Sequence, residues 1–223
     1  MPKLRPETQK ARRERILDAA ELCFARAGFH RCTMQDICRE AGISPGALYV
    51  YFASKEDLIA GIAERNRAKL AAQLAELTHA PDLLSALAKL GEHYAVEEPQ
   101  HKRVLGLEIG GEATRNPTVA ATFHSVDAYC RQSFEQVFER AREDGKIRPE
   151  DDPRTLAEVV ALIGDGLFWR RAVDPEFDAH RVLPVLVRMV RTLLNPVEMV
   201  PDEAPPPPSG VKAANPEKSE ARS

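Results

Sequence analysis

The sequence predicts an all-α protein of about nine helices, and three observations support this fold class. Apolar residues recur at spacings of three and four over most of the chain, as they do on one face of a helix. Sustained alternation of apolar and polar residues is absent, and no Asn-Gly or Asp-Gly pair joins two strand-like segments. Prolines, glycines and capping residues divide the chain into segments of helical length.

The first helix is predicted from about Thr8 to Ala27, and Gly28 follows it as a C-terminal stop. Its apolar positions form a single stripe, which predicts one buried face. The stripe consists of Ile16, Ala19, Ala20, Cys23, Phe24 and Ala27.

Two short helices come next, joined by a glycine. Thr33 is the expected cap of the second helix, with Asp36 placed for a capping box, and the helix ends before Gly42. The third helix is expected over Ser44–Tyr51, where the serine is a good cap and Pro45 occupies the first helical position.

The rest of the chain divides at caps and prolines into six longer helices, followed by a segment rich in proline and charge. That segment, residues 201–223, lacks the large apolar residues needed for a core and is predicted to be a disordered tail. The six helices are expected over about 54–77, 82–98, 101–115, 116–144, 152–173 and 176–194.

Charge is distributed unevenly along the chain. Residues 1–55 contain ten lysines and arginines against six acidic residues, whereas residues 56–223 contain 21 against 28. A basic first part on an acidic remainder indicates that only the first part meets a polyanion. A basic arm near the N-terminus is compatible with phosphate or minor-groove contact and equally with a solvated face; it consists of Lys3, Arg5, Lys10, Arg12, Arg13 and Arg15.

Composition indicates a globular protein in a reducing compartment. No apolar run reaches the length of a membrane helix and the N-terminus lacks the apolar stretch of a signal peptide, so we expect a cytoplasmic protein without a membrane partner. Four cysteines suggest no disulfide framework.

The second and third predicted helices have the dimensions of a helix-turn-helix. Such a unit lays its second helix in the major groove of DNA, while nearby helix N-termini direct backbone N–H groups at phosphates. Three hydroxyl caps, at Thr33, Ser44 and Ser54, are placed for this. Pro45, Gly46 and Ala47 are small enough for close approach to bases.

Residues 33–58 resemble the DNA-binding signature of the TetR (tetracycline repressor) family. The shared pattern is Thr33, Ala41-Gly42, Ser44-x-Gly46-x-Leu48-Tyr49-x-Tyr51-Phe52 and Ser54-Lys55-Glu56-x-Leu58. Cys38 departs from it, since a small alanine is usual there.

The resemblance implies that specific side chains contact operator DNA. It places the start of the second helix, the first residues of the third helix, two tyrosine hydroxyls and one lysine at the DNA. We add two residues of the second helix as sources of sequence specificity. Leu48 and Phe52 are predicted to be core. The predicted DNA-binding residues are Thr33, Met34, Gln35, Ser44, Pro45, Gly46, Ala47, Tyr49, Tyr51 and Lys55.

The resemblance also implies a domain organisation. It predicts a helix-turn-helix domain over 1–55 and a helical ligand-binding and dimerisation domain over 56–200, with a cavity among its helices. Residues 162–171 are similar to betaine-regulator-type members. We chose apolar residues with a few polar groups among them as candidate ligand contacts: Leu105, Glu108, Ile109, Phe123, Asp127, Cys130, Phe134, Phe168 and Trp169.

The last two predicted helices each have an apolar stripe. Two such stripes can pair with their copies as a four-helix bundle, although they could also pack only inward. The predicted homodimer interface consists of Leu156, Val159, Val160, Ile163, Leu167, Val182, Leu186, Met189, Val190 and Leu193.

Rival classes find little support in the motifs. No nucleophile elbow, His-Glu-x-x-His, phosphate loop or dinucleotide fingerprint is present, so we expect neither an enzyme nor a cofactor. The spacings of Cys23, Cys32 and Cys38 are not those of chelating pairs, so no metal is expected. Cysteine-based redox sensing remains the alternative signal.

Together these features predict a dimeric transcriptional repressor. It should bind a palindromic double-stranded operator and be released by a small hydrophobic or aromatic inducer. The resemblance implies an efflux or catabolic gene as its target.

Overall fold

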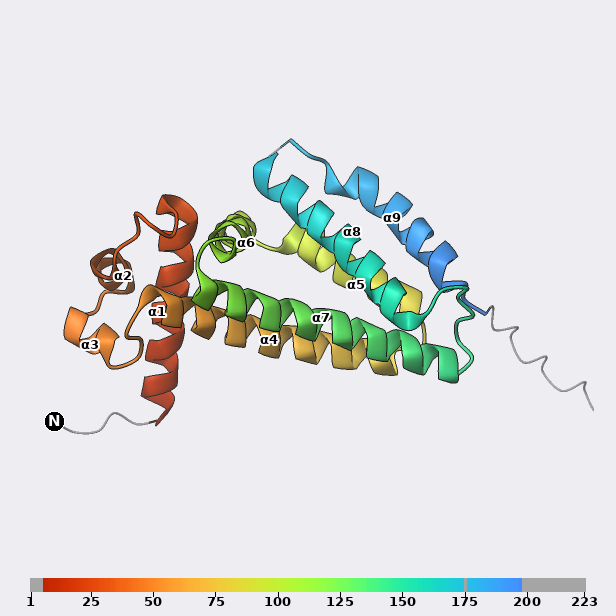
Figure 1. Ribbon diagram of the computed structural model, residues 1–223, viewed down its shortest axis with the longest axis horizontal. Helices are drawn as coiled ribbons and strands as arrows, with labels where there is room; N and C mark the ends of the chain where they lie inside the picture. Colours follow the sequence, from red (N-terminus) through yellow and green to blue (C-terminus); the bar gives the residue numbers. More distant parts are fainter. Residues whose placement is uncertain (1–5, 175, 198–223) are drawn as a thin grey trace, which may run out of the picture.

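The computed structural model describes residues 6–174 and 176–197, and this part of the chain folds into nine α-helices and one short π-helix (Figure 1). The all-α prediction is confirmed; the predicted tail, residues 201–223, lies outside the described residues. The elements are α1 (Pro6–Ala27), α2 (Met34–Ala41), α3 (Pro45–Tyr49), α4 (Lys55–His79), α5 (Leu83–Glu92), the π-helix η1 (His93–Glu97), α6 (Gln100–Ala113), α7 (Pro117–Glu143), α8 (Pro153–Val173) and α9 (Ala179–Leu194).

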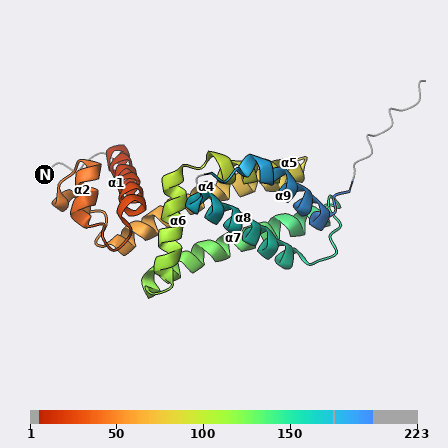
Figure 2. The ribbon, with the colours of Figure 1, turned by 90° about the horizontal axis from the view of Figure 1, so that it is seen from above.

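The molecule is elongated, with α1, α2 and α3 at one end. We call these three helices the head and the helices from α5 onward the body. The long helices α4 and α7 run side by side in the same direction from the head into the body (Figure 1). Helix α8 packs against α7, and α9 packs against α8 and α5. The helix α6 lies between the head and the other body helices (Figure 2).

Buried apolar residues form two cores. The first fills the head and also takes in Ile59 and Ile62 of α4, Leu105 of α6 and Val119 of α7. The second lies in the body, where Phe134 and Phe138 of α7 stack on each other among residues of α4, α5, α8 and α9. Since the head core continues past residue 55, the head is packed onto α4 and α6 through apolar contacts.

Most predicted helix bounds agree with the structure within a few residues. Helix α9 begins later than expected because Asp178 caps it by accepting a hydrogen bond from the backbone N–H of Arg181. Residues 93–97, expected to continue a single α-helix, form a π-helical turn, in which the N–H of Glu98 donates to the carbonyl of His93. Such turns are frequent at functional sites.

None of the described helices is both long enough and apolar enough to cross a membrane.

Candidate nucleic-acid interface and effector region

The turn between α2 and α3 depends on Gly42. This residue has φ 62°, in the left-handed region where glycine carries no steric cost, and its N–H bonds the carbonyls of Arg39 and Cys38. The chain therefore reverses within three residues and sets α3 at an angle to α2. This is the helix-turn-helix geometry that the sequence predicts.

All three predicted hydroxyl caps are present. Thr33 and Asp36 form a reciprocal capping box at the start of α2. Ser44 accepts from the N–H of Ala47 at α3, and Ser54 accepts from the N–H of Asp57 at α4. These caps fix where each helix begins, because each satisfies a backbone donor that the helix leaves free.

The two helices divide cleanly into an inner and an outer face. Ile37, Cys38, Leu48 and Phe52 are buried in the head core, which confirms that Leu48 and Phe52 are core residues and that the cysteine fits there. The predicted DNA-binding residues lie outside this core or at its edge. Thr33, Gln35, Ser44, Pro45, Gly46 and Tyr49 are exposed, while Met34, Ala47, Tyr51 and Lys55 are half-buried.

The outer face of α3 combines an open glycine with exposed large side chains. A Cβ added at Gly46 would meet no atom within 4 Å, so packing within the chain does not require a glycine here. Tyr49 is 55% exposed, and the neighbouring Val50 is 79% exposed. Sequence reasoning missed Val50; its apolar side chain beside an otherwise polar turn is the signal that could have found it.

Lys55 is held partly inside the chain. Its ammonium donates to the carbonyls of Phe29 and His30, and it lies 4.3 Å from the centre of the Phe29 ring. The lysine therefore joins the start of α4 to the loop after α1. A phosphate contact from this residue has to share the ammonium with these acceptors.

Arg65 of α4 connects the head to the long helix pair. Its guanidinium, 10% exposed, binds the carboxylates of Glu14, Asp18 and Glu21 of α1, with the Asp18 contact at 2.7 Å. Burial opposes its charge, but hydrogen bonds to Glu21, Glu14 and Asp18 outweigh burial and raise the pKa of Arg65. The angle between α1 and α4 is thus held by an ionic cluster whose centre, Arg65 and Glu21, is largely buried.

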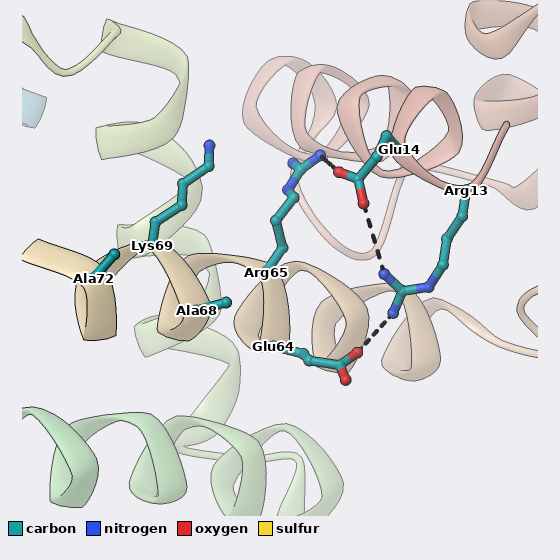
Figure 3. A pocket seen from close by; sticks show the side chains of 7 residues that line it. All are labelled: Arg13, Glu14, Glu64, Arg65, Ala68, Lys69 and Ala72. Atoms are coloured by element: carbon teal, nitrogen blue, oxygen red, sulfur yellow. Dashed lines mark hydrogen bonds and ion pairs between the residues drawn. The ribbon is translucent and has the colours of Figure 1, made fainter. Parts of the chain in front are cut away.

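An open groove of about 770 Å³ runs beside this cluster (Figure 3). Arg13 on its wall pairs with Glu64 at 2.7 Å and lies near Glu14. The groove is widely open to solvent and lined by charged side chains and alanines, so it does not enclose a hydrophobic ligand. Its lining is Arg13, Glu14, Glu64, Arg65, Ala68, Lys69 and Ala72.

Three of the predicted ligand contacts lie on the face of α6 that is turned toward the head. Glu108 accepts a hydrogen bond from the backbone N–H of Phe29, Leu105 belongs to the head core, and Ile109 packs against that core. Helical spacing puts these three residues on one face of α6, and that face packs on the head. One turn further, buried Glu112 binds His30 at 2.8 Å and Arg115 at 2.9 Å.

The remaining ligand candidates are also spread out. Phe134 lies in the body core, whereas Trp169 is 55% exposed and Phe123 is 39% exposed. Asp127 pairs with Arg131 at 2.6 Å. Phe168 packs on Gly106 of α6, where a Cβ would come within 2.6 Å of the ring.

The thiols are poor candidates for reactive sites. Cys23, Cys32 and Cys38 are buried in the head. Burial raises the pKa of each, that of Cys32 to about 12, and it raises the pKa of half-buried Cys130 to about 11. The thiolate is the reactive form, so little of it is present near neutral pH.

An apolar stripe is exposed on α8 and α9. Leu162, Trp169 and Val173 lie on one face of α8, between 48% and 69% exposed, and Val185 and Met189 of α9 are 45% and 50% exposed. Leu156, predicted to face a partner, is instead buried in the body core. The predicted stripe on α8 includes this inward face because helical spacing alone does not say which of two apolar faces is covered.

Two descriptions of known protein families match this chain. The description "Bacterial regulatory proteins, tetR family" matches residues 16–62, and "BetI-type transcriptional repressor, C-terminal" matches residues 86–195. The chain is 33% identical over 154 residues to the HTH-type transcriptional regulator UidR of Escherichia coli, a match that covers 67% of this chain and 76% of UidR.

Solved structures agree in fold. Salmonella enterica GusR superposes with a TM-score of 0.72 at 29% identity, over 82% of this chain and 95% of GusR. The SmeT–triclosan complex gives 0.72 at 23% identity, over 90% of this chain and all of SmeT.

Proposed function

The chain belongs to the TetR family of bacterial regulatory proteins and is a TetR-type transcriptional repressor, not an enzyme; from this premise we propose that it binds a palindromic operator as a homodimer and is released by a small hydrophobic or aromatic inducer. The observation that carries the proposal is the outer face of α2 and α3. It presents small and hydrogen-bonding residues around a glycine that the fold itself does not need.

We assign the DNA contacts in two groups. The helix N-termini at Thr33, Ser44 and Lys55 meet phosphates, because their free N–H groups and the helix dipoles favour anions. Gln35 and the residues 45–47 face the major groove, where a glutamine reads adenine and an alanine methyl contacts thymine. Tyr49 and Tyr51 place hydroxyls on the backbone, and exposed Val50 adds an apolar contact.

We assign dimerisation to the apolar stripe on α8 and α9. Monomers rarely leave several large apolar side chains exposed together, and those of Leu162, Trp169 and Met189 are at least half exposed. Of the predicted interface, Met189 belongs to this stripe, and we assign the half-buried Val159, Ile163, Leu167, Val182 and Leu186 to its border. Val160, Val190 and Leu193 instead pack against the body core, as Leu156 does. The division into a DNA-binding domain over 1–55 and an effector and dimerisation domain over 56–200 fits these assignments.

We place the inducer site among the helices α4–α8, away from the head. The gene that the repressor controls is an efflux or catabolic gene. SmeT is described with triclosan, an aromatic ligand, and this chain shares its fold. Redox sensing is disfavoured, because burial of the cysteines raises their pKa.

The test begins with selection of DNA from a random duplex pool by the wild-type protein. We expect an inverted-repeat consensus, to which Tyr49→Ala binds at least about tenfold more weakly while remaining dimeric. Selection that yields no consensus, or a Tyr49→Ala variant with wild-type affinity, would show that α3 is not the recognition helix.

A further inference from the structure

Arg103 of α6 is a buried cation without a counterion. It is 2% exposed, yet its guanidinium meets only uncharged acceptors. One terminal nitrogen, Nη2, donates to the carbonyls of Val96 at 3.0 Å and Ala95 at 3.4 Å, and the other, Nη1, donates to the side chain of Gln100 at 3.4 Å. Its Nε has no hydrogen-bond partner.

A second guanidinium approaches the same place from α8. Arg171, which is half-buried, donates through Nε to the carbonyl of Ala95 at 3.1 Å and through Nη1 to the carbonyl of Phe177 at 3.1 Å. Two arginines thus bind one carbonyl group of η1. Burial, together with the charge of Arg171, lowers the pKa of Arg103.

The nearby acidic group does not neutralise this pair. Glu98 lies close enough to act on Arg103 through its charge, but its carboxylate binds Lys102 at 3.2 Å and His93 at 3.7 Å. Among the described residues, no carboxylate lies within 4 Å of either guanidinium. An uncompensated buried charge is costly, and carbonyl dipoles compensate it only in part.

An aromatic side chain, Phe168, lies one helical turn from this pair of arginines. Gly106, one turn along α6 from Arg103, accepts the ring of Phe168 against its backbone. Phe168 is in turn one turn before Arg171 on α8. An aromatic side chain thus lies within one helical turn of each cation, and the carbonyls of Ala95 and Val96 that they bind belong to the π-helical turn.

We propose that Arg103 and Arg171 bind the carboxylate of an anionic effector, whose apolar part lies toward Phe168. A carboxylate matches the planar fork of a guanidinium and can use the unpartnered Nε of Arg103. This proposal rests on the proposed function and narrows it, since it makes the inducer an organic acid. A neutral hydrophobic compound leaves both cations as they are.

The position of Arg103 connects this site to the head. The same helix presents Glu108 to Phe29 and Glu112 to His30 on its other face. An anion bound at Arg103 replaces carbonyl contacts that tie α6 to η1. Its binding therefore acts on the helix that holds the head, and operator affinity changes with it.

The test uses the full-length protein and matched acids and amides: acetate, hexanoate and phenylacetate, each against its own amide at equal concentration. We expect at least one acid to raise the melting temperature by about 3 °C while its amide does not. Arg103→Met should abolish that difference, and Arg154→Met, which removes an exposed arginine of α8, should retain it. Should Arg103→Met fail to fold, Arg171→Met serves as the same test.

Two results would overturn the proposal: no acid exceeds its amide in the wild type, or the difference survives in the Arg103 and Arg171 variants. Operator binding by the wild type without any acid is measured in parallel. If the wild type does not bind operator, the proposed function is contradicted. If it binds operator but acids and amides shift the melting temperature equally, only the proposed effector chemistry is contradicted.

Discussion

Gly46 lies on the outer face of α3, where the chain itself does not require a glycine. A Cβ there would meet nothing within 4 Å, and alanine is favoured over glycine in a helix. We predict that Gly46→Ala leaves the melting temperature unchanged or slightly higher but weakens operator binding about tenfold, because the methyl group holds α3 away from the bases. Gly111→Ala, at an exposed position of α6 where only the end of the Arg115 side chain would lie within 4 Å, is the matched control. Equal operator affinities of the two variants would contradict the assigned groove face.

Lys55 combines an internal and an external role. Its ammonium binds the Phe29 and His30 carbonyls, so Lys55→Ala should lower the melting temperature by a few degrees. The variant should also bind every duplex more weakly. The slope of log affinity against log salt concentration should fall by about one unit. Fluorescence anisotropy at several salt concentrations measures this. A loss confined to the operator, with random DNA bound as before, does not fit a phosphate contact.

Local side-chain contacts could be predicted from the sequence, whereas contacts between distant helices could not. The caps at Thr33, Ser44 and Ser54 were predictable because each contact spans three residues. The cluster around Arg65 and the isolated charge of Arg103 were not, because their partners are fixed by how distant helices pack. A buried arginine and an exposed one look alike in a sequence.

At the scale of elements, the capping box of α2 makes its stability depend on pH. Hydrogen bonds from the side chain and backbone of Thr33 lower the pKa of Asp36. A lowered folded-state pKa means that this stabilisation is complete above the unfolded value of about 3.9 and is lost as pH falls through the folded value.

We therefore predict that Asp36→Asn is less stable than the wild type at neutral pH and that the difference disappears as pH falls below about 3.9. Urea unfolding of both proteins across this range measures it. A difference that stays constant with pH would mean that the charge of Asp36 does not contribute.

The stripe on α8 and α9 gives a second prediction for elements. Trp169→Glu should produce monomers, because a charge replaces a large apolar contact in the proposed dimer face. Leu156→Ala should leave the dimer intact but lower the stability of each chain by about 2–5 kcal/mol, because it opens a cavity in the body core. Sedimentation with thermal melting separates the two effects. A dimeric Trp169→Glu variant places the interface elsewhere.

The positions of the helices in the sequence were predicted more reliably than which side of each helix is buried. Local spacing and caps fix where α7 and α8 begin, and the structure agrees. Which side of a helix is covered depends on neighbours: Leu105 and Glu108 turned out to face the head, and Leu156 faces the body core. The π-turn η1 carries no local signal that distinguishes it from an α-helix.

The whole molecule is a head joined to a long body through the apolar head core and through polar contacts with α4 and α6. Arg65 joins α1 to α4, and the carboxylates of α6 bind the loop after α1. In the proposed dimer, a change in the body can therefore alter the angle of each head without separating the two chains. Two recognition helices must lie about 34–36 Å apart to enter successive major grooves, so a small change of angle affects operator affinity strongly.

Hydroxyl-radical footprinting of the selected duplex tests the central claim most directly. A dimer that reads DNA through both α3 helices should protect two half-sites related by twofold symmetry, with centres about one helical turn apart. The pattern should disappear with Tyr49→Ala and should lose its twofold symmetry with Trp169→Glu. A single asymmetric protected region, or the same two half-sites in the Tyr49→Ala variant, would contradict the account.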